Sequence, residues 1–567
     1  MAQASIHAAD PPGEIRPEGA SGLPDAAEDS PADPTASVAA PDGAAMAQNG
    51  SATAPHGSVT GPVAPDGSAL DGSALDGSAL DGSALDGSAP DGPAADRAGL
   101  VTGGNGPVER VMSTVIRKLA WSRLSNPRVA LTVSGVGLLL GLLVGATAPN
   151  DETLPLRLPL SHLLPSLAHD PVIASAALYT GDILACLGLA GMLWAHSQGW
   201  RPNARHLLLA SIGIVAIMVC LTPVGSSDTA SYAVYGRIAA LGHNPYVMTP
   251  AALHEPNYLA AVGSIWKTQV SVYGPVATGI QAFAAWIGGA SVVSTIWVLM
   301  ILNGIAFVGI GVLLYKTSDD PVRATLFWTA NPVIIQQMVG GGHLDTFVAA
   351  VAIAAILVAR RFSGLWGDVA VGLLIGLGCG VKANAALVAV GLAWPLLLRH
   401  EWLRTTRIAA IALAVVAAEY SYYGLNALKA LVGGLKFVTL PSPWWLFQEA
   451  GLGLGVSKAT MGTVISVLWP IALLVVAWLI YQRISADQPR EVVAPFALTF
   501  AWVLVAPWVF AWYTAIAWVA LAVVPRNRMT RWLAIVTVVL ALWHSSGGQV
   551  GGSHPVALHL LHLSGGG

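Results

Sequence analysis

Residues able to do chemistry gather in short polar stretches between long apolar runs. Asp228 opens the segment SSDTASYAVYGRIAALGHNPY, and Tyr232 and Tyr235 follow it at the i+4 and i+7 positions of one helical face. A carboxylate in such a place can accept a proton, and a cationic side chain can hold an anion. Arg237 lies in the same segment, and three further ionisable candidates, His343, Asp345 and Lys382, are predicted to lie at the ends of membrane spans, where such groups are functional candidates by default.

Each candidate also has a purely structural explanation. Tyr and Trp near a membrane interface usually anchor the protein there, which would account for Trp444, Trp445, Trp508 and Trp512. Lys382 can snorkel to the interface, and His343 with Asp345 can cap a helix. Asp228 is harder to explain in this way, because it directly follows a predicted span and opens a segment dense in hydrogen-bonding residues.

The composition is that of a membrane protein. Hydrophobic residues make up 54% of the 567 residues and charged residues only 10%, against about 25% charged in soluble domains. Three cysteines (Cys186, Cys220, Cys379) lie in apolar runs without CxxC or CxxH spacing. This pattern excludes a disulfide framework and a thiolate metal site, and it favours buried small hydrophobes.

The first hundred residues differ sharply from the rest. They hold 15 of the 31 acidic residues and two of the 28 basic ones, with a repeated Asp-Gly-Ser-Ala-Leu unit from Asp66 to Asp91. One Leu per five residues cannot bury enough surface to offset chain entropy. We therefore expect a disordered acidic tail over 1–108, without the apolar region of a signal peptide. A docking arm for a partner is the alternative. The predicted membrane domain is 109–546, and a short Gly- and His-containing tail follows at 547–567.

The membrane domain is predicted to be all-α and polytopic, with about 13 spans long enough to cross roughly 30 Å of hydrocarbon. The basic residues ahead of the first span place the N-terminus in the cytoplasm by the positive-inside rule. The predicted spans are 129–148, 172–195, 207–223, 291–315, 323–339, 344–359, 366–381, 383–398, 407–425, 461–481, 491–507, 512–524 and 530–543.

One apolar stretch decides on which side of the membrane each loop lies. The stretch 276–290 is short for a span. The basic loops near both ends of the chain all lie on the cytoplasmic side only if this stretch runs along the outer face. The segment 224–290 is then an extracytoplasmic acceptor and catalytic loop, and the candidate residues gather on that face. We expect a multi-pass protein of the cell membrane with an extracytoplasmic site.

Several short motifs of the sequence, taken together, resemble those of a known family. The Asp228 segment, the downstream IW and VYGP, FWTANP followed ten residues later by HLD, and VKA ahead of an apolar span resemble actinobacterial polyprenol-phosphomannose-dependent alpha-1,6-mannosyltransferases of the glycosyltransferase C superfamily. The similarity covers roughly 130–530. It implies a glycosyltransferase C-like helical bundle, with a catalytic carboxylate after an early span and a surface helix before the next one. HLD departs from the His-Asn-Asp or His-Asn-Glu that is usual at this place in the family.

The resemblance implies a mannosyl donor on a polyprenyl phosphate and a glycan or glycolipid acceptor of the cell envelope. A phosphate leaving group is already anionic, so a cationic cradle and one general base suffice. Asp228 is the expected base, acting with inversion and without a cofactor or metal. Lys382, His343 and Arg237 are expected on the phosphate side, and the other expected substrate-binding residues are Asp345, Tyr232, Tyr235, Tyr246, Trp266, Tyr273 and Tyr513.

Two alternatives stay open at the level of sequence. A flippase or transporter would place charged residues and broken helices near the bilayer midplane, in matching positions of two repeats. The distinctive polar residues here cluster instead at outer span ends, which favours the enzyme. Transfer of a different sugar, such as arabinose, or transfer to a protein acceptor is equally compatible with the superfamily. Nothing in the composition indicates a nucleic-acid partner.

Overall fold

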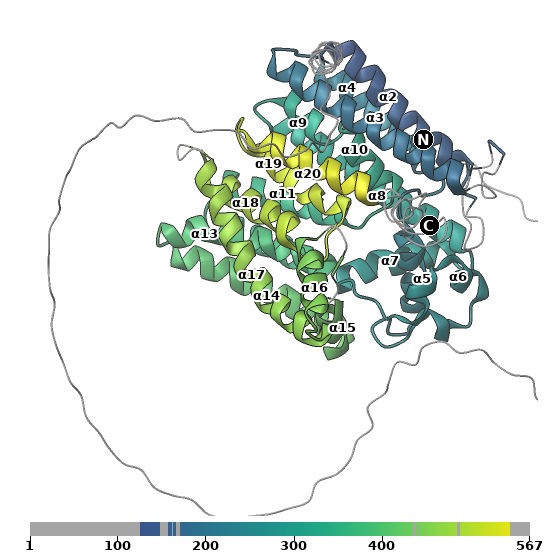
Figure 1. The fold of residues 1–567 in the computed structure, drawn as a ribbon. Helices are drawn as coiled ribbons and strands as arrows, with labels where there is room; N and C mark the ends of the chain where they lie inside the picture. The colour runs from purple at the N-terminus through teal and green to yellow at the C-terminus, as the bar shows by residue number, and fades with distance from the viewer. Residues whose placement is uncertain are drawn as a thin grey trace, which may run out of the picture. The chain divides into compact units, whose positions relative to one another are not determined.

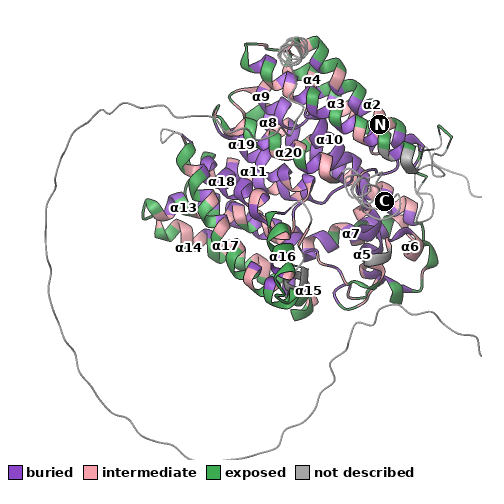
Figure 2. Cartoon of the chain, viewed as in Figure 1, coloured by how far each residue is buried: buried purple, intermediate pink, exposed green. Residues whose placement is uncertain are grey.

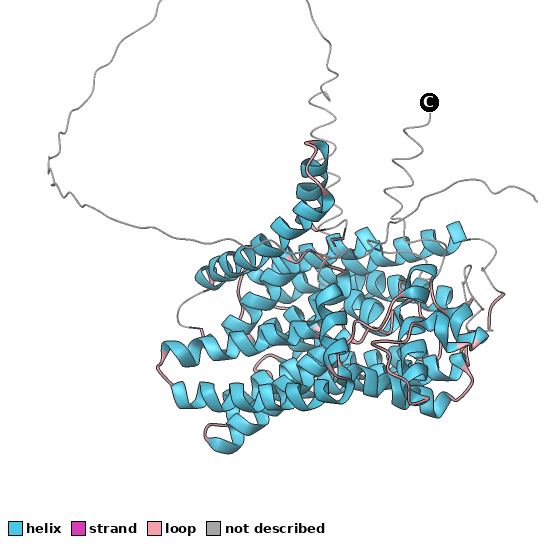
Figure 3. Ribbon diagram, turned by 90° about the horizontal axis from the view of Figure 1, so that it is seen from below, coloured by secondary structure: helices cyan, strands magenta, loops and turns pink. Residues whose placement is uncertain are grey.

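The computed structural model describes residues 125–147, 157–161, 163–165, 171–434, 438–439, 442–484 and 488–544. Every regular element in these ranges is a helix (Figure 3), which confirms the all-α class. The predicted acidic tail at 1–108 and the tail at 547–567 lie outside the described residues, so these two assignments stay predictions.

Three helices open the described chain: α2 (Pro127–Ala146), α3 (Pro171–Ser197) and α4 (Ala204–Met218). α2 and α3 run side by side (Figure 1) and meet through small residues. A Cβ at Gly137 would lie 2.7 Å from the Gly181 oxygen and from the Ala185 nitrogen. Close backbone approach of this kind is typical of packed membrane helices.

The segment after α4 carries the predicted catalytic loop. Its elements are α5 (Asp228–Ala240), η1 (Pro250–Leu253), α6 (Pro256–Ala261), η2 (Ser264–Thr268) and α7 (Pro275–Gly288). α7 is the helix expected to lie along the outer face. It packs on α5 with one side, and exposes Phe283, Trp286 and Ile287 on the other. An exposed apolar side suits a helix in contact with lipid.

The expected single span at 323–339 is wrong. After α8 (Val292–Thr317) the chain forms three short pieces: α9 (Pro321–Phe327), α10 (Pro332–Ile335) and the π-turn η3 (Gln336–Gly340). Pro332 cannot continue a helix from the preceding turn, and the Asn331 side chain caps the new one by accepting from the Val333 and Ile334 amides at 3.2 Å. Pro332–Gly340 then turns by 119° into α11 (Asp345–Arg361), as a broken span or a re-entrant loop.

The remaining elements complete the helical domain. They are α12 (Leu365–Val381), η4 (Ala383–Ala385), α13 (Ala386–Leu398), α14 (Trp402–Tyr423), α15 (Leu425–Gly434), α16 (Pro443–Gly453), α17 (Lys458–Arg483), α18 (Arg490–Val505), η5 (Ala511–Tyr513), α19 (Thr514–Val523) and α20 (Met529–His544). All ten residues of α19 are buried. Figure 2 shows many buried residues around α10 and α11.

Four described helices are long and apolar enough to cross a membrane: Pro127–Ala146, Ala176–Ser197, Val292–Thr317 and Lys458–Arg483. The bent pair of Pro332–Gly340 and Asp345–Arg361 makes a fifth if it is one span. Shorter apolar helices accompany them. The helices are those of a membrane protein, while the count of about 13 spans is not confirmed.

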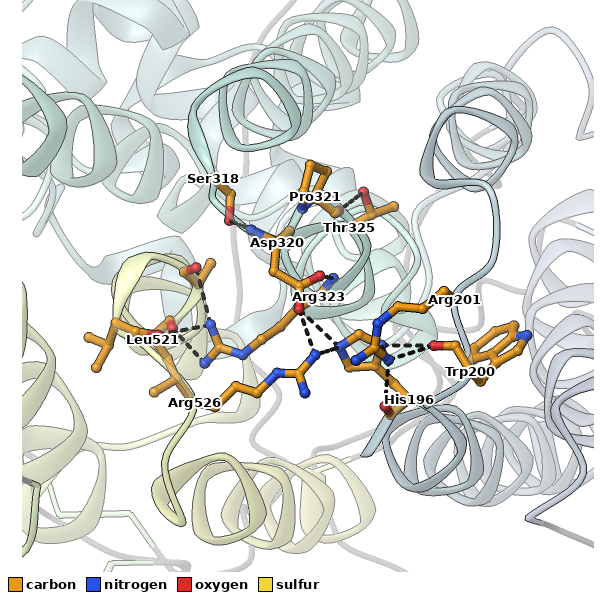
Figure 4. Close-up of polar contacts among 12 residues, drawn as sticks. His196, Trp200, Arg201, Ser318, Asp320, Pro321, Arg323, Thr325, Leu521 and Arg526 are labelled. Atoms are coloured by element: carbon orange, nitrogen blue, oxygen red, sulfur yellow. Dashed lines mark hydrogen bonds and ion pairs between the residues drawn. The ribbon is translucent and has the colours of Figure 1, made fainter. Parts of the chain in front are cut away.

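The loop after α3, the loop before α9 and the loop after α19 meet at a group of polar residues (Figure 4). We call this group the polar clamp; it consists of His196, Arg201, Asp320, Arg323 and Arg526. Asp320 Oδ2 lies 3.3 Å from His196 Nε2 and accepts from Arg526 at 2.8 Å. Arg323 donates to carbonyl oxygens at the end of α19, including that of Val524 at 2.8 Å. The clamp joins the three loops at one place.

Candidate active site

The first group of the site forms around the Asp228 carboxylate, at the first residue of α5. The Tyr232 hydroxyl, one turn later, donates to Asp228 Oδ2 at 3.1 Å, as the i+4 spacing predicts. His343 Nδ1 lies 3.4 Å from the same oxygen, without the geometry of a hydrogen bond. The Asp228 side chain is 21% exposed, so the carboxylate is reachable while most of it is enclosed.

A glycine turn between η3 and α11 presents His343 to Asp228. Gly342 has a φ of +65°, and a Cβ there would lie 2.4 Å from Cγ2 of Thr229. The amide of Asn303, from the middle of α8, donates to the His343 carbonyl at 2.6 Å. On its other side the imidazole stacks on Trp512, with ring centres 3.8 Å apart and planes 14° apart. The ring is therefore held from the backbone and from one face.

The second group is an ion pair between two helix ends. Lys382 Nζ donates to Asp345 Oδ2 at 2.6 Å, and the Asp345 side chain is fully buried. Asp345 begins α11 and Lys382 follows α12, so these two helices form a hairpin with the pair at its open end. The ammonium lies 4.8 Å from the ring centre of Tyr513 and 6.0 Å from that of Tyr273. Both rings present their faces to the cation.

Aromatic rings join the two groups. Tyr273 meets Tyr232 edge to face at 5.0 Å, and Tyr513 stacks on Trp502 at 4.8 Å. Tyr235 borders this wall, with its ring 6.4 Å from that of Tyr273, and its hydroxyl donates to the Gln269 carbonyl at 3.0 Å. We call the set of Asp228, Tyr232, Tyr235, Tyr273, His343, Asp345, Lys382 and Tyr513 the Asp228 cluster.

The electrostatics of the cluster keep Asp228 charged and Tyr232 protonated. Burial by itself raises the pKa of the Asp228 carboxyl, but His343, Lys382 and the Tyr232 hydroxyl outweigh it and hold the pKa below its usual value. Burial, and next the charge of Asp228, raise the pKa of the Tyr232 hydroxyl well above its usual value. At neutral pH the cluster therefore offers a carboxylate that is ready to accept a proton.

Three of the sequence candidates lie apart from the cluster. Arg237 forms a two-pronged ion pair with Glu255, with Nε 2.9 Å and Nη2 2.7 Å from Oε1. The Tyr246 hydroxyl is 2.8 Å from Oγ1 of Thr278, and the Tyr246 ring lies edge to face with Tyr423. Trp266 lies in η2, partly buried against the core.

Sequence reasoning missed one contributor and assigned another differently. Trp512 was expected as an interface anchor, but it stacks on His343. Asn303, a polar residue in the middle of the apolar α8, donates to the His343 carbonyl. A polar residue inside an apolar run is the signal that could have found Asn303.

Across the described residues, no three His, Cys, Asp or Glu side chains are grouped so as to hold a metal ion. The expectation of a metal-free reaction stays a prediction. The polar groups that the cluster offers to a substrate are a carboxylate, an imidazole and the N–H groups of Lys382 that Asp345 leaves unused.

Comparisons with known proteins identify a matching family model and several relatives. The model of the family described as "Alpha-(1->6)-mannopyranosyltransferase, N-terminal domain" matches residues 129–398, a range that includes Asp228, His343, Asp345 and Lys382. No solved structure matches the chain.

Two curated relatives carry the name "Alpha-(1->6)-mannopyranosyltransferase A". The protein of Mycobacterium tuberculosis is 26% identical over 392 residues, which cover 62% of this chain and 72% of the relative. That of Corynebacterium glutamicum is 26% identical over 256 residues, which cover 38% of this chain and 51% of the relative. The chain thus spans about half the length of the second relative and most of the first. The family model and the names of both relatives support a mannosyltransferase enzyme.

Proposed function

We propose that the chain transfers a mannosyl residue from a polyprenyl-phosphate donor to a glycan or glycolipid acceptor on the extracytoplasmic face, with Asp228 as general base and with inversion. The observation that carries this proposal is the reachable Asp228 carboxylate, with a lowered pKa, beside a lysine ammonium on the same aromatic wall. The names of the relatives support mannose as the sugar and alpha-1,6 as the linkage.

The leaving group sets the first chemical requirement. A polyprenyl phosphate departs as an anion, so positive charge and N–H donors stabilise it better than a general acid does. The Lys382 ammonium has three N–H donors and gives one to Asp345 at 2.6 Å. The other two are left for a phosphate oxygen. Asp345 then fixes the direction in which the ammonium points.

The acceptor sets the second requirement, which is removal of a hydroxyl proton as the new glycosidic bond forms. The deprotonated Asp228 carboxylate can take that proton, and the Tyr232 hydrogen bond holds its orientation. Attack from the Asp228 side, opposite the departing phosphate, inverts the anomeric carbon. A beta-linked donor would give the alpha product, as the family resemblance implies.

In vitro transfer tests this function directly. The full chain in membranes is offered polyprenyl-phosphate mannose, the matching arabinose donor, or a nucleoside-diphosphate mannose, each with a short alpha-mannoside acceptor. We expect transfer from the polyprenyl-phosphate mannose alone, and an alpha-1,6 linkage in the product by NMR. Transfer from the nucleotide sugar, a beta linkage, or movement of the lipid donor across vesicles without any transfer would each overturn the proposal.

A separate experiment tests which side of the membrane the site faces. Ser271 in the predicted outer loop is fully buried, so a reporter cysteine belongs at the exposed Thr268, with its counterpart at the exposed Asp319 beside the polar clamp. In a variant whose three natural cysteines are replaced, we expect an impermeant thiol reagent to label position 268 in intact cells and to spare position 319 until the cells are lysed. Labelling of 319 in intact cells would contradict the extracytoplasmic placement of the site.

A further inference from the structure

A second charged region lies at the far end of the helix hairpin that carries the Asp345–Lys382 pair. A cavity of about 340 Å³ opens there between α11, α12, α13, α14 and α18, three of which (α13, α14 and α18) lie together in Figure 1. The charged residues that line the cavity are Arg360, Arg361, Arg399, Arg404 and Glu491. Four arginines against one carboxylate give the lining a surplus of positive charge.

The arginines differ in how they are held. Arg404 donates to the buried Asp368 at 2.9 Å and to Glu401 at 3.2 Å, and Arg399 pairs with Glu491. Arg360 and Arg361, at the exposed end of α11, make no hydrogen bond or ion pair with any described residue. Their guanidinium groups keep their donors for a ligand, and the geometry of a guanidinium suits a phosphate.

Below the charged rim the cavity is apolar. Val371, Leu392 and Ile408 line it, and all three side chains are buried. A free phosphate ion would use the rim alone. A molecule with an anionic head and an apolar body would cover both parts, because apolar surface is then removed from water together with the paired charge.

The position of the cavity also favours an amphiphile. α11 begins at Asp345 in the Asp228 cluster and ends at Arg361 in the cavity. Seventeen helical residues are about 25 Å long, close to the thickness of the hydrocarbon core. The cavity thus lies near the headgroup depth of the membrane face opposite the Asp228 cluster, where basic pockets between helices bind anionic lipids.

We propose that this cavity binds the phosphate-bearing headgroup of an anionic phospholipid, with Arg360 and Arg361 contacting the phosphate. Binding here is independent of the proposed transfer reaction. The full chain, purified in a neutral detergent, is titrated with phosphatidylglycerol, phosphatidylcholine or inorganic phosphate, and bound lipid is measured by native mass spectrometry. We expect phosphatidylglycerol to bind, phosphatidylcholine to bind much more weakly, and millimolar phosphate to leave the bound lipid in place.

Three variants test whether the lipid binds at Arg360 and Arg361. Arg360→Gln/Arg361→Gln should weaken phosphatidylglycerol binding about 30-fold, because each arginine near an anionic headgroup contributes a factor of roughly five. Glu491→Gln removes the one acid of the lining and leaves Arg399 with Glu401 as its one remaining acidic partner among the described residues, so it should tighten binding. The control pair Arg483→Gln/Arg528→Gln removes two exposed charges outside the cavity and should bind as the unaltered protein does.

Each other outcome counts against the proposal. Equal loss in the control pair would mean attraction to positive charge in general, and unchanged binding in the Arg360/Arg361 variant would place the lipid elsewhere. Complete displacement by phosphate would indicate a site for a free anion. A double variant that does not fold is replaced by Arg361→Gln alone, whose side chain is exposed, and Glu491→Gln must still raise the affinity.

Discussion

Two regions of the molecule each place a histidine beside an aspartate carboxylate, and the surroundings of the two pairs differ. In the Asp228 cluster, His343 Nδ1 lies 3.4 Å from the Asp228 carboxylate; in the polar clamp, His196 Nε2 lies 3.3 Å from that of Asp320. Both pairs join segments far apart in the chain. By distance alone the two pairs are indistinguishable.

The difference lies in what surrounds each pair. In the clamp, His196 Nδ1 has the Trp200 carbonyl at 3.2 Å, while Asp320 accepts from the Arg323 amide at 3.0 Å and from Arg526. In the cluster, the buried His343 Nδ1 and one oxygen of Asp345 have no hydrogen-bond partner among the described residues. Buried polar groups are normally satisfied. We propose that the groups left unsatisfied beside a reachable carboxylate receive a substrate, whereas the saturated network is a structural joint.

The largest effect that separates the two regions is expected from Asp228→Asn. The amide keeps the size and part of the hydrogen bonding but removes the basicity, so transfer should fall about 10²–10⁴-fold. Donor binding and the thermal unfolding of the purified protein should change little. The measurement is initial transfer rate at equal protein amount, together with retention of a labelled donor.

Asp320→Asn is the matched control for Asp228→Asn, because it makes the same chemical change in the other pair. If Asp228→Asn transfers mannose at nearly the normal rate, the base lies elsewhere, and Asp345 is the next carboxylate to substitute. If Asp320→Asn abolishes transfer in protein that is still folded, the distinction between the two regions fails.

The next effect in size is expected from Lys382→Gln. A contact to the donor phosphate exists in the ground state and strengthens in the transition state, so both KM for the donor and kcat should worsen. We expect kcat/KM to fall about 10–100-fold, which corresponds to the loss of one or two charge-assisted hydrogen bonds. A changed kcat with an unaltered KM for the donor would argue that Lys382 acts only by positioning Asp345.

A smaller effect, on stability, is expected in the polar clamp. Asp320→Asn loses the charge that faces Arg526 and His196, and the hydrogen bonds of partly exposed charged groups contribute about 1–2 kcal/mol. The protein should therefore unfold at a lower temperature in detergent while its transfer rate per folded molecule is preserved. Unchanged thermal unfolding would show that the clamp contributes nothing to holding the three loops.

The effect of Tyr232→Phe is subtler and appears in the pH profile. The Tyr232 hydrogen bond stabilises charged Asp228, so its loss raises the pKa of the carboxyl. Below that pKa the base is protonated and transfer is lost, and the acid limb of kcat/KM should therefore move to higher pH than in the unaltered protein. An acid limb that stays in place while the rate falls would mean that Tyr232 serves the substrate and not Asp228.

The smallest effect is expected from Arg237→Gln. Arg237 is paired with Glu255 in a partly exposed position, and such pairs contribute about 1 kcal/mol or less. Transfer should stay within about fivefold of normal. A loss as large as that of Lys382→Gln would restore Arg237 to the phosphate side, where the sequence analysis expected it.

Much of the site follows from periodicity alone. The i+4 relation of Asp228 and Tyr232 is realised as a hydrogen bond, and the helix at 276–290 forms as α7. The same periodicity shows why Arg237 lies apart. Nine residues of helix after Asp228 amount to about two and a half turns, which place Arg237 on the opposite side of α5 and roughly 13 Å along its axis.

Other features depend on tertiary contacts that no local pattern carries. Asp345 and Lys382 are 37 positions apart in the sequence and meet because α11 and α12 form a hairpin. The same holds for the stacking of Trp512 on His343. The break at Pro332 was foreseeable from its chemistry, but mean apolarity over 323–339 outweighed it in predicting a span.

The glycine turn that presents His343 also limits how this enzyme can diverge. A Cβ at Gly342 would meet Thr229, and one at Gly341 would lie 2.7 Å from the His343 ring. A side chain at Gly341 would press on the imidazole, and one at Gly342 would press on Thr229 in a backbone conformation that favours glycine, so this turn resists single-step variation. We therefore expect new donor or acceptor preferences, whether selected in nature or in a library, to arise elsewhere in the cluster, around Tyr513 and Tyr273.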